Sequence, residues 1–254
     1  SKGGWPGSSP LAVAWECCQA SLLCSKCPML FRAWDADQPG GQVYHEQQRQ
    51  RCCGVHAVNN LLQLPPDSDG HLQKREADSI ATDLRDADAR ASGVWSVLPC
   101  PASTYHSRVP CYGGNYDVDV LVEALRRRGC HITEHWIVSC KRSMQNFRSG
   151  LAQWLPRSPS TVGRLRGLLL NRRSRLGRGR HWLCLAPSGP GGAWLCHDSA
   201  CRQPAALGGE AEGTTWADSI ARHVEADLRR AMCLRQCLPG SPSPVHIFAV
   251  CSPS

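Results

Sequence analysis

The sequence predicts a protein of the α+β class, in which helical segments come first and strands dominate later. Apolar residues recur at helical spacing up to about residue 125, whereas residues 131 to 138, 181 to 198 and 245 to 251 have the apolar runs or alternation of strands. Strand and helix do not alternate regularly, which disfavours a βαβ array. A chain of 254 residues that is 42% hydrophobic can bury a full core.

Two regions are expected along the chain. Residues 1–39 are punctuated by Gly, Pro and Ser without a sustained period, so they are interpreted as a flexible, cysteine-rich appendage. Residues 40–254 are expected to form one domain. Cys24 and Cys27 form a CxxC that could be half of a zinc site, but a second well-spaced pair is lacking. Reduced cysteines, with no metal and no cofactor, are therefore expected.

Neither a signal peptide nor a membrane span is predicted. The apolar run Leu11 to Trp15 is too short for a signal, and apolar residues nowhere continue for the roughly 18 positions that a membrane helix needs. A cytoplasmic location is the resulting expectation, although the first residue is Ser rather than Met. The oligomeric state is left open.

Positive charge is concentrated in one arginine-rich segment. The net charge is +8, and seven arginines lie between Arg164 and Arg180. Such a cluster could bind nucleic acid or an acidic protein face. No aromatic platform is interleaved with it, so a solvated basic loop is favoured and a nucleic-acid partner is considered unlikely.

Three helices are predicted before residue 130. The first begins at or just after the paired cysteines and ends before Pro65-Pro66, because Val55, Val58 and Leu62 share one face. A second amphipathic helix lies around residues 77 to 84, and residues 88 to 114 are expected to be irregular. The third follows Asp117 as cap and ends near Gly129 after three arginines.

The later elements are mainly strands. Residues 131 to 138 alternate as a strand, and residues 245 to 251 form an apolar closing strand. Between them, Trp216, Ile220, Val224 and Leu228 repeat at every fourth position, which predicts a helix.

Residues 181 to 198 predict a β-hairpin around a Ser-Gly-Pro-Gly-Gly turn. If the turn centres between Gly189 and Pro190, His181 lies opposite Asp198, at about 5 Å between Cβ atoms. The carboxylate could then orient the imidazole. A slip of one residue would instead bring His197 into line, so both registers are kept open.

The pair Cys52-Cys53 stands where a helix N-terminus would favour a thiolate. Gly54 would leave room for a substrate carbonyl, and the N–H of Cys53 could face a developing oxyanion. Gln48 is a candidate for the second oxyanion donor, with Gln47 as the nearest alternative.

His181 and Asp198 complete a possible thiol-hydrolase set. His181 would accept the thiol proton and later donate it to the leaving amine, while Asp198 would hold the tautomer. His56 lies one helical turn after Cys53 and is interpreted as a packing or capping residue. Each of these residue types also has an ordinary structural explanation, and only their joint order favours catalysis.

Several segments resemble the Josephin family of cysteine deubiquitinases. They are residues 44 to 48 (YHEQQ), 53 to 60 (CGVHAVNN), 114 to 120 (GNYDVDV), 181 to 182 (HW) and 198 to 199 (DS). The similarity runs from about residue 43 to 251 and is nearer to the small Josephin-only proteins than to the ataxin type. Two departures are an apparent insertion, LQLPPDSDGH, and a poor match over residues 88 to 111.

The resemblance implies a papain-like fold, with a helical lobe packed on an antiparallel sheet. It also implies hydrolysis of the isopeptide or peptide bond after the C-terminal glycine of ubiquitin, with ubiquitin or polyubiquitin conjugates as partners. On this basis Cys53, in CxxH, matches the nucleophile rather than Cys52, His181 the base, Asp198 the orienting residue and Gln48 the oxyanion donor.

Three hypotheses remain for function. The first is a cysteine-type ubiquitin hydrolase, and the second is a catalytically weak ubiquitin-binding module on the same fold. The third makes the terminal cysteines a metal or disulfide framework. A secreted papain-type protease is disfavoured, because a CGSCW-like nucleophile signature is absent.

Overall fold

The structure is a computed structural model, and it describes residues 43–48, 52–91, 116–155, 165–173, 180–189, 192–208, 215–237 and 244–252. The predicted appendage, residues 1–39, and its CxxC lie outside the described residues. The elements follow in this order: α2 (Cys53–Leu62), α3 (Lys74–Ala91), α4 (Val118–Arg127), β1 (His131–Val138), α5 (Lys141–Trp154), β2 (Leu165–Arg173), β3 (Arg180–Pro187), β4 (Trp194–His197), β5 (Ala205–Ala206), α7 (Trp216–Cys237) and β6 (Val245–Cys251).

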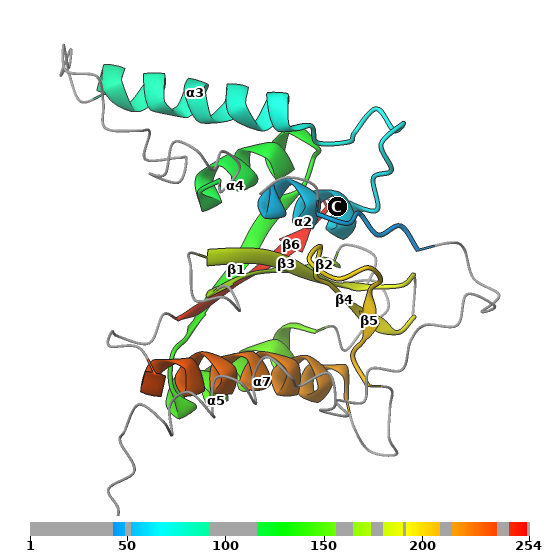
Figure 1. The fold of residues 1–254 in the computed structure, drawn as a ribbon, viewed down its shortest axis with the longest axis vertical. Coiled ribbons are helices and arrows are strands. Elements are labelled where there is room, and N and C mark those ends of the chain that lie inside the picture. Colours follow the sequence, from blue (N-terminus) through cyan, green and yellow to red (C-terminus); the bar gives the residue numbers. More distant parts are fainter. Residues whose placement is uncertain are drawn as a thin grey trace, which may run out of the picture.

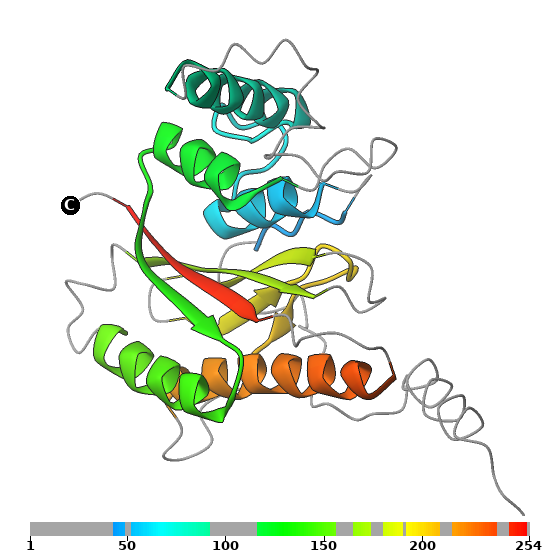
Figure 2. The same ribbon diagram turned by 90° about the vertical axis from the view of Figure 1, so that its left-hand side faces the viewer.

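The strands form one six-stranded sheet in the order β1-β6-β2-β3-β4-β5, and every neighbouring pair is antiparallel. Helices cover both faces: α2 and α4 lie on one side with α3 beyond them, and α5 and α7 lie on the other (Figures 1 and 2). The α+β prediction is therefore confirmed.

The two faces of the sheet carry separate hydrophobic clusters. Along β3, Trp182 and Cys184 pack toward α2, whereas Leu183 and Leu185 pack toward α5 and α7. This alternation follows from the two-residue period of a strand. Because each fully buried Leu or Val contributes roughly 1.5–3 kcal/mol, burial on both faces holds the sheet between its helical layers.

Local sequence signals fix the ends of α4. The Asp117 carboxylate caps the helix by accepting from the N–H of Val118 at 2.5 Å. At the other end Gly129 has φ +70°, and the N–H of Cys130 bonds back to the carbonyl of Leu125 at 2.9 Å. This is the left-handed turn that favours glycine after a helix. The predicted helix and its glycine stop are both confirmed.

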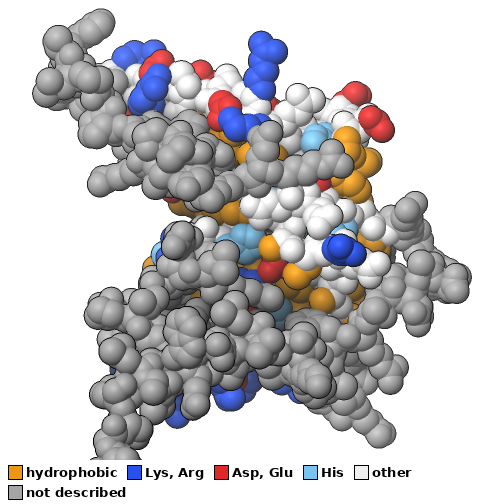
Figure 3. Space-filling model, in the orientation of Figure 1, with side chains coloured by type: hydrophobic (Ala, Val, Ile, Leu, Met, Phe, Trp, Pro, Cys, Tyr) orange, Lys and Arg blue, Asp and Glu red, His pale blue; other side chains and the backbone are white. Residues whose placement is uncertain are grey.

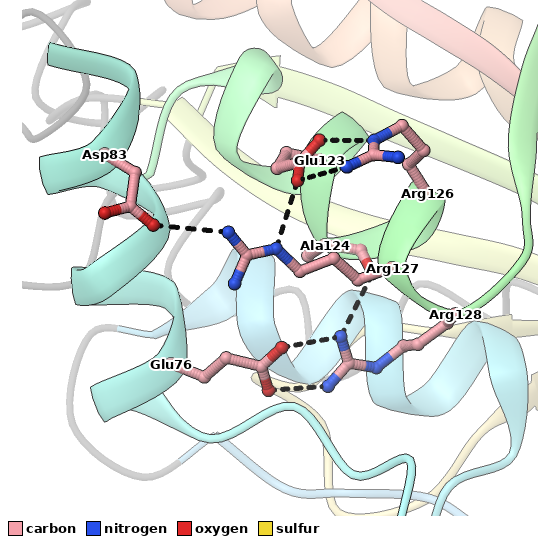
Figure 4. A network of polar contacts seen from close by, with 7 residues as sticks. All are labelled: Glu76, Asp83, Glu123, Ala124, Arg126, Arg127 and Arg128. Carbon is pink, nitrogen blue, oxygen red and sulfur yellow. Dashed lines mark hydrogen bonds and ion pairs between the residues drawn. The ribbon is translucent and has the colours of Figure 1, made fainter. Parts of the chain in front are cut away.

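Ion pairs tie α3 to the end of α4 (Figure 4). Arg128 donates from both terminal nitrogens to the carboxylate of Glu76, at 3.1 and 2.8 Å. Its side chain is only 10% exposed, so this bidentate pair is better shielded from water than a surface pair. Arg127 reaches Asp83 at 3.3 Å in a more exposed position, where an ion pair contributes little. Acidic and basic side chains mix over α3 (Figure 3).

The predicted helices and strands agree with α2, α3, α4, α7, β1 and β6. Helix α3 continues to Ala91, a few residues past the expected boundary at about 88, and the rest of the segment expected to be irregular, residues 92–114, lies outside the described residues. One expectation was wrong. Residues 165–173 form strand β2 in the middle of the sheet rather than a solvated basic loop, because the run Leu168 to Leu170 is fully buried. Helix α5 and the short strand β5 were not predicted.

Within the described ranges, no helix combines the length and the apolar character that a membrane crossing requires.

Gly167 in β2 is expected to be essential for the close packing of α2 on the sheet. Its φ is +147°, and a Cβ there would lie 2.3 Å from the Leu185 carbonyl oxygen and 2.7 Å from a methyl of Leu61. We expect Gly167→Ala to lower the free energy of unfolding by roughly 1–3 kcal/mol, through overpacking and backbone strain. Urea denaturation measures it. Gly208→Ala is the control, since nothing lies within 4 Å of the added methyl; equal stability of both variants would contradict this account.

Candidate active site

Cys53 is the first residue of helix α2 and lies against the start of β3. Its side chain is buried, and its sulfur accepts a hydrogen bond from the backbone N–H of Trp182 at 3.5 Å. The N-terminus of a helix carries a partial positive charge, which favours an anion at this place. Because helix α2 begins at Cys53, its thiol lies beside His181.

His181 connects the thiol to a carboxylate. Its Nε2 lies 2.7 Å from Oδ1 of Asp198, and the imidazole is also hydrogen-bonded to Cys53. Because Nε2 faces the carboxylate, Nδ1 is the nitrogen left for the sulfur. The structure thus brings together the three predicted residues Cys53, His181 and Asp198, which lie 128 and 17 positions apart in the sequence.

Asp198 follows strand β4 and is held by several donors. Its Oδ1 accepts from the backbone N–H of Ala200 at 3.0 Å as well as from His181, and its Oδ2 accepts from Arg172 at 2.8 Å. Burial alone would raise the pKa of Asp198, but the hydrogen bond and charge of His181, and then the charge of Arg172, hold it well below its usual range. The carboxylate is therefore ionised at neutral pH.

The pKa of the His181 imidazole is shifted in the opposite direction, upward. Burial opposes its charged form, yet the hydrogen bonds and charges of Asp198 and Cys53 raise the pKa of His181 to about 9. At neutral pH the ring is then an imidazolium, so it can act as a proton donor beside the Cys53 sulfur. A nucleophile, an acid–base group and an orienting carboxylate in this order can perform acyl transfer.

The two adjacent cysteines have different surroundings. Cys52 is buried just before α2, and this burial raises the pKa of its thiol. Cys53, by contrast, has the hydrogen bonds to His181 and Trp182. The geometry therefore distinguishes the neighbours without reference to any family pattern.

The hairpin exists, but its register differs from the predicted one. Cys184 pairs with His197 and Pro187 with Trp194, so Leu183 rather than His181 lies opposite position 198. The shift is two residues, because the observed pairing centres between positions 190 and 191, one position later than the predicted centre between Gly189 and Pro190. A two-residue shift preserves the face of the sheet. Asp198 thus still reaches His181 diagonally across the strands.

His197, the alternative produced by a one-residue slip, belongs to another contact. It is buried, and its Nδ1 lies 3.3 Å from Nδ1 of His45. Burial, together with the nearby His45, lowers the pKa of His197 to about 3. A neutral ring on the other side of the strand is a poor candidate for the base that serves Cys53.

Gln48 lies at the end of the described segment 43–48, beside the loop that carries Asp198. Its backbone N–H donates to the carbonyl of Ser199 at 2.7 Å. Upstream, the ring of His45 bonds the Cys201 carbonyl at 3.1 Å, so two contacts fasten this segment to the loop after β4. Gln48 is half-buried, whereas its rival Gln47 is exposed. Of the two predicted oxyanion donors, Gln48 is thus the one that is partly buried and whose backbone is bonded to the loop after β4.

A buried polar cluster fixes the same segment to α2. Nδ1 of His56 lies 3.0 Å from the Glu46 carboxylate, whose other oxygen accepts from Asn59 at 2.9 Å. Asn60 accepts from the N–H of Glu46 and donates back to its carbonyl. The interpretation of His56 as a packing residue is confirmed. The two asparagines of VHAVNN, Asn59 and Asn60, hold Glu46 against α2 through hydrogen bonds.

Gly54 and Arg172 differ from the sequence interpretation. A Cβ at Gly54 would lie 3.2 Å from Leu121, so its small size lets α2 approach α4 rather than leaving space for a substrate. Arg172, part of the expected surface cluster, is buried against Asp198. The sequence contained a sign of this burial, because Arg172 alternates in step with the inward-facing Leu168 and Leu170.

No metal centre or disulfide is found within the part of the chain that the structure describes. No group of three or more His, Cys, Asp or Glu side chains in these ranges could hold a metal ion. The described cysteine side chains are free thiols, including Cys251 near the C-terminus. The third hypothesis, a cysteine framework, thus has no support from these ranges.

The raised pKa of His181 predicts a pH-dependent contribution to stability. The folded state binds this proton more tightly than the unfolded chain does, so the contribution is complete below pH 6.5 and lost as pH rises through about 9. We expect the stability difference between the wild type and His181→Gln to shrink by up to about 3 kcal/mol between pH 6 and 9.5, at about 1.4 kcal/mol per pKa unit.

Urea unfolding under reducing conditions at both pH values measures this difference. His131→Gln is a control, because His131 is exposed at the start of β1 and lies outside the site. A difference for His181→Gln that stays constant with pH would contradict the assigned charge.

Comparison with known proteins shows the family to which the chain belongs. The sequence model of the family described as Josephin matches residues 48–215. Human Josephin-2 is 31% identical over 204 residues, which cover 77% of this chain and 87% of that protein. A Josephin-like protein of Arabidopsis thaliana is 29% identical over 159 residues, covering 62% of this chain and 39% of that protein. The chain therefore belongs to the Josephin family.

Proposed function

We propose that the protein is a cysteine-type ubiquitin hydrolase that cleaves the bond after the C-terminal glycine of ubiquitin. The observation that carries the proposal is the linked arrangement of Cys53, His181 and Asp198, with 2.7 Å between the imidazole and the carboxylate. Membership of the Josephin family supports ubiquitin as the substrate.

In the proposed reaction, the Cys53 thiolate attacks the carbonyl carbon of the terminal glycine. The His181 imidazolium then donates its proton to the leaving amine, and a thioester remains on the sulfur. Water, deprotonated by His181, attacks the thioester and expels the Cys53 thiolate; the released ubiquitin carboxyl group loses its proton to solvent, and the thiolate and imidazolium are restored. Asp198 keeps Nε2 engaged throughout, so that Nδ1 always faces the sulfur.

The burial of the sulfur supports a narrow substrate. Cys53 is 2% exposed, so an approaching chain end must be slim and extended. A glycine at the scissile bond meets this requirement because it has no side chain to accommodate. The N–H of Cys53, at the start of the helix, and the side-chain amide of Gln48 are the proposed oxyanion donors.

Labelling with a ubiquitin that carries a C-terminal electrophile tests the nucleophile. We expect an adduct of one ubiquitin on the wild type and on Cys52→Ala, and none on Cys53→Ala, because only Cys53 is hydrogen-bonded to His181. Intact-mass measurement followed by peptide mapping gives the result. Equal labelling of both variants would reject the assignment. Ubiquitin binding without an adduct or cleavage would instead favour the binding-module hypothesis.

A second experiment tests the oxyanion donor. Gln48→Ala is expected to lower kcat for a fluorogenic ubiquitin amide on the order of 10²-fold, the usual loss for one donor. Gln47→Ala is the matched control and should retain activity, because Gln47 is exposed. Steady-state rates at saturating substrate decide between them. A large loss in Gln47→Ala with none in Gln48→Ala would reverse the two roles.

A further inference from the structure

Arg172 lies on β2 directly opposite His181 on β3. Its side chain is 7% exposed, which is unusual for an arginine in a segment so rich in positive charge. Burial of a guanidinium requires partners that offset its desolvation. The identity of these partners connects Arg172 to the site described above.

The guanidinium bridges two buried carboxylates that come from different parts of the fold. Nη2 donates to Oδ2 of Asp198 at 2.8 Å, and Nη1 donates to Oδ1 of Asp227 at 2.5 Å. Asp227 is 1% exposed and belongs to α7, the helix on the far face of the sheet. The planar fork of an arginine can hold both carboxylates in fixed directions, which a lysine ammonium cannot.

The two oxygens of Asp198 are divided between these neighbours. Oδ1 accepts from His181, while Oδ2 accepts from Arg172. With a charged donor on each oxygen, rotation of the carboxyl group would break one strong hydrogen bond. If Arg172 were removed, the carboxylate would keep only the donors on Oδ1, and its orientation toward the imidazole would be less restricted.

The charges of the groups around Arg172 also agree with a role in holding Asp198 against His181. Asp198 lies between two basic side chains, Arg172 and His181, while Asp227 lies between Arg172 and, at 3.8 Å, His223. Buried charge is tolerated best when it is paired in this way. The arrangement therefore favours the imidazolium state that the proposed reaction uses.

We propose that Arg172 is a positioning residue: it fixes the Asp198 carboxylate against His181 and, through Asp227, fastens this carboxylate to helix α7. The inference deepens the proposed hydrolase function and rests on it. Arg172 itself touches neither the sulfur nor, in this proposal, the substrate.

The test uses a paired substitution, because removal of Arg172 alone would leave two carboxylates buried beside each other. In Arg172→Met/Asp227→Leu both the cation and its outer partner become apolar, a change that folded proteins tolerate. For the fluorogenic ubiquitin amide we expect kcat to fall on the order of 10²-fold with KM nearly unchanged, as for a small misplacement of a reacting group.

Arg229→Met is the matched control. Arg229 also lies on α7 in an ion pair, with Glu225 at 2.7 Å, but its side chain is 74% exposed. Its kcat and KM should equal those of the wild type. Circular dichroism and urea unfolding establish that each variant is folded before its rates are compared. A folded Arg172→Met/Asp227→Leu protein with wild-type kcat would overturn the proposal.

A thermodynamic cycle separates positioning from general support of the fold. When the paired substitution is added to Asp198→Ala, kcat should fall no further, because the group that Arg172 positions is already absent. A second drop of similar size in the Asp198→Ala background would show that Arg172 acts by another route and would overturn the proposal.

A readout without substrate distinguishes failure of this inference from failure of the proposed function. In the wild type and in Arg229→Met, the proton on Nε2 of His181 should give a downfield resonance that is slow to exchange, because Asp198 holds it. The signal should broaden or vanish in Asp198→Ala and in the paired variant. An unchanged signal in the paired variant would contradict the role of Arg172. Wild-type protein that shows the signal but cleaves no ubiquitin amide would reject the hydrolase function alone.

Discussion

The hydrogen bond from the backbone of Trp182 to the sulfur of Cys53 joins the helical layer to the sheet at the point where the site forms. Trp182 is anchored on both sides: its indole N–H donates to the Tyr116 carbonyl at 3.2 Å, and its ring lies 5.9 Å from that of Phe248. Because His181 is its neighbour in the chain, the packing of one tryptophan sets the distance between the thiol and the imidazole. The contact is therefore both a packing feature and the basis of the proposed chemistry.

A series of polar and charged groups extends outward from that contact, each in contact with the next. The thiol meets an imidazole, the imidazole a carboxylate, and the carboxylate a buried guanidinium that ends on α7. Each successive partner compensates the desolvation of the one before it. Helix α7, which lies on the opposite face of the sheet from α2, is thus connected to the site through Asp227 and Arg172. Stability of this part of the fold and preorganisation of the proposed reaction depend on the same set of charges.

Sequence reasoning found most of the scaffold, since the helical stripes and the alternating strands depend on local periodicity. It also predicted Cys53, His181 and Asp198 from their residue types and order, with the family resemblance selecting Cys53 over Cys52, and the fold brings the three together. It failed where long-range pairing decides the structure. The hairpin register depends on turn geometry that composition does not fix, and the strand character of β2 was hidden by its arginines. Arg172 illustrates the limit: its charge suggested solvent, while its position beside Leu170 indicated the interior.

The central claim is that residue 53 carries the reacting sulfur and that His181 and Asp198 stand behind it. The most direct measurement is a crystal structure of the protein after reaction with ubiquitin bearing a C-terminal electrophile. We expect the ubiquitin terminus bonded to Sγ of Cys53, the imidazole of His181 beside that sulfur, and its Nε2 still near 2.7 Å from Asp198. A terminus bonded to another cysteine, or an imidazole turned away from both groups, would contradict the account.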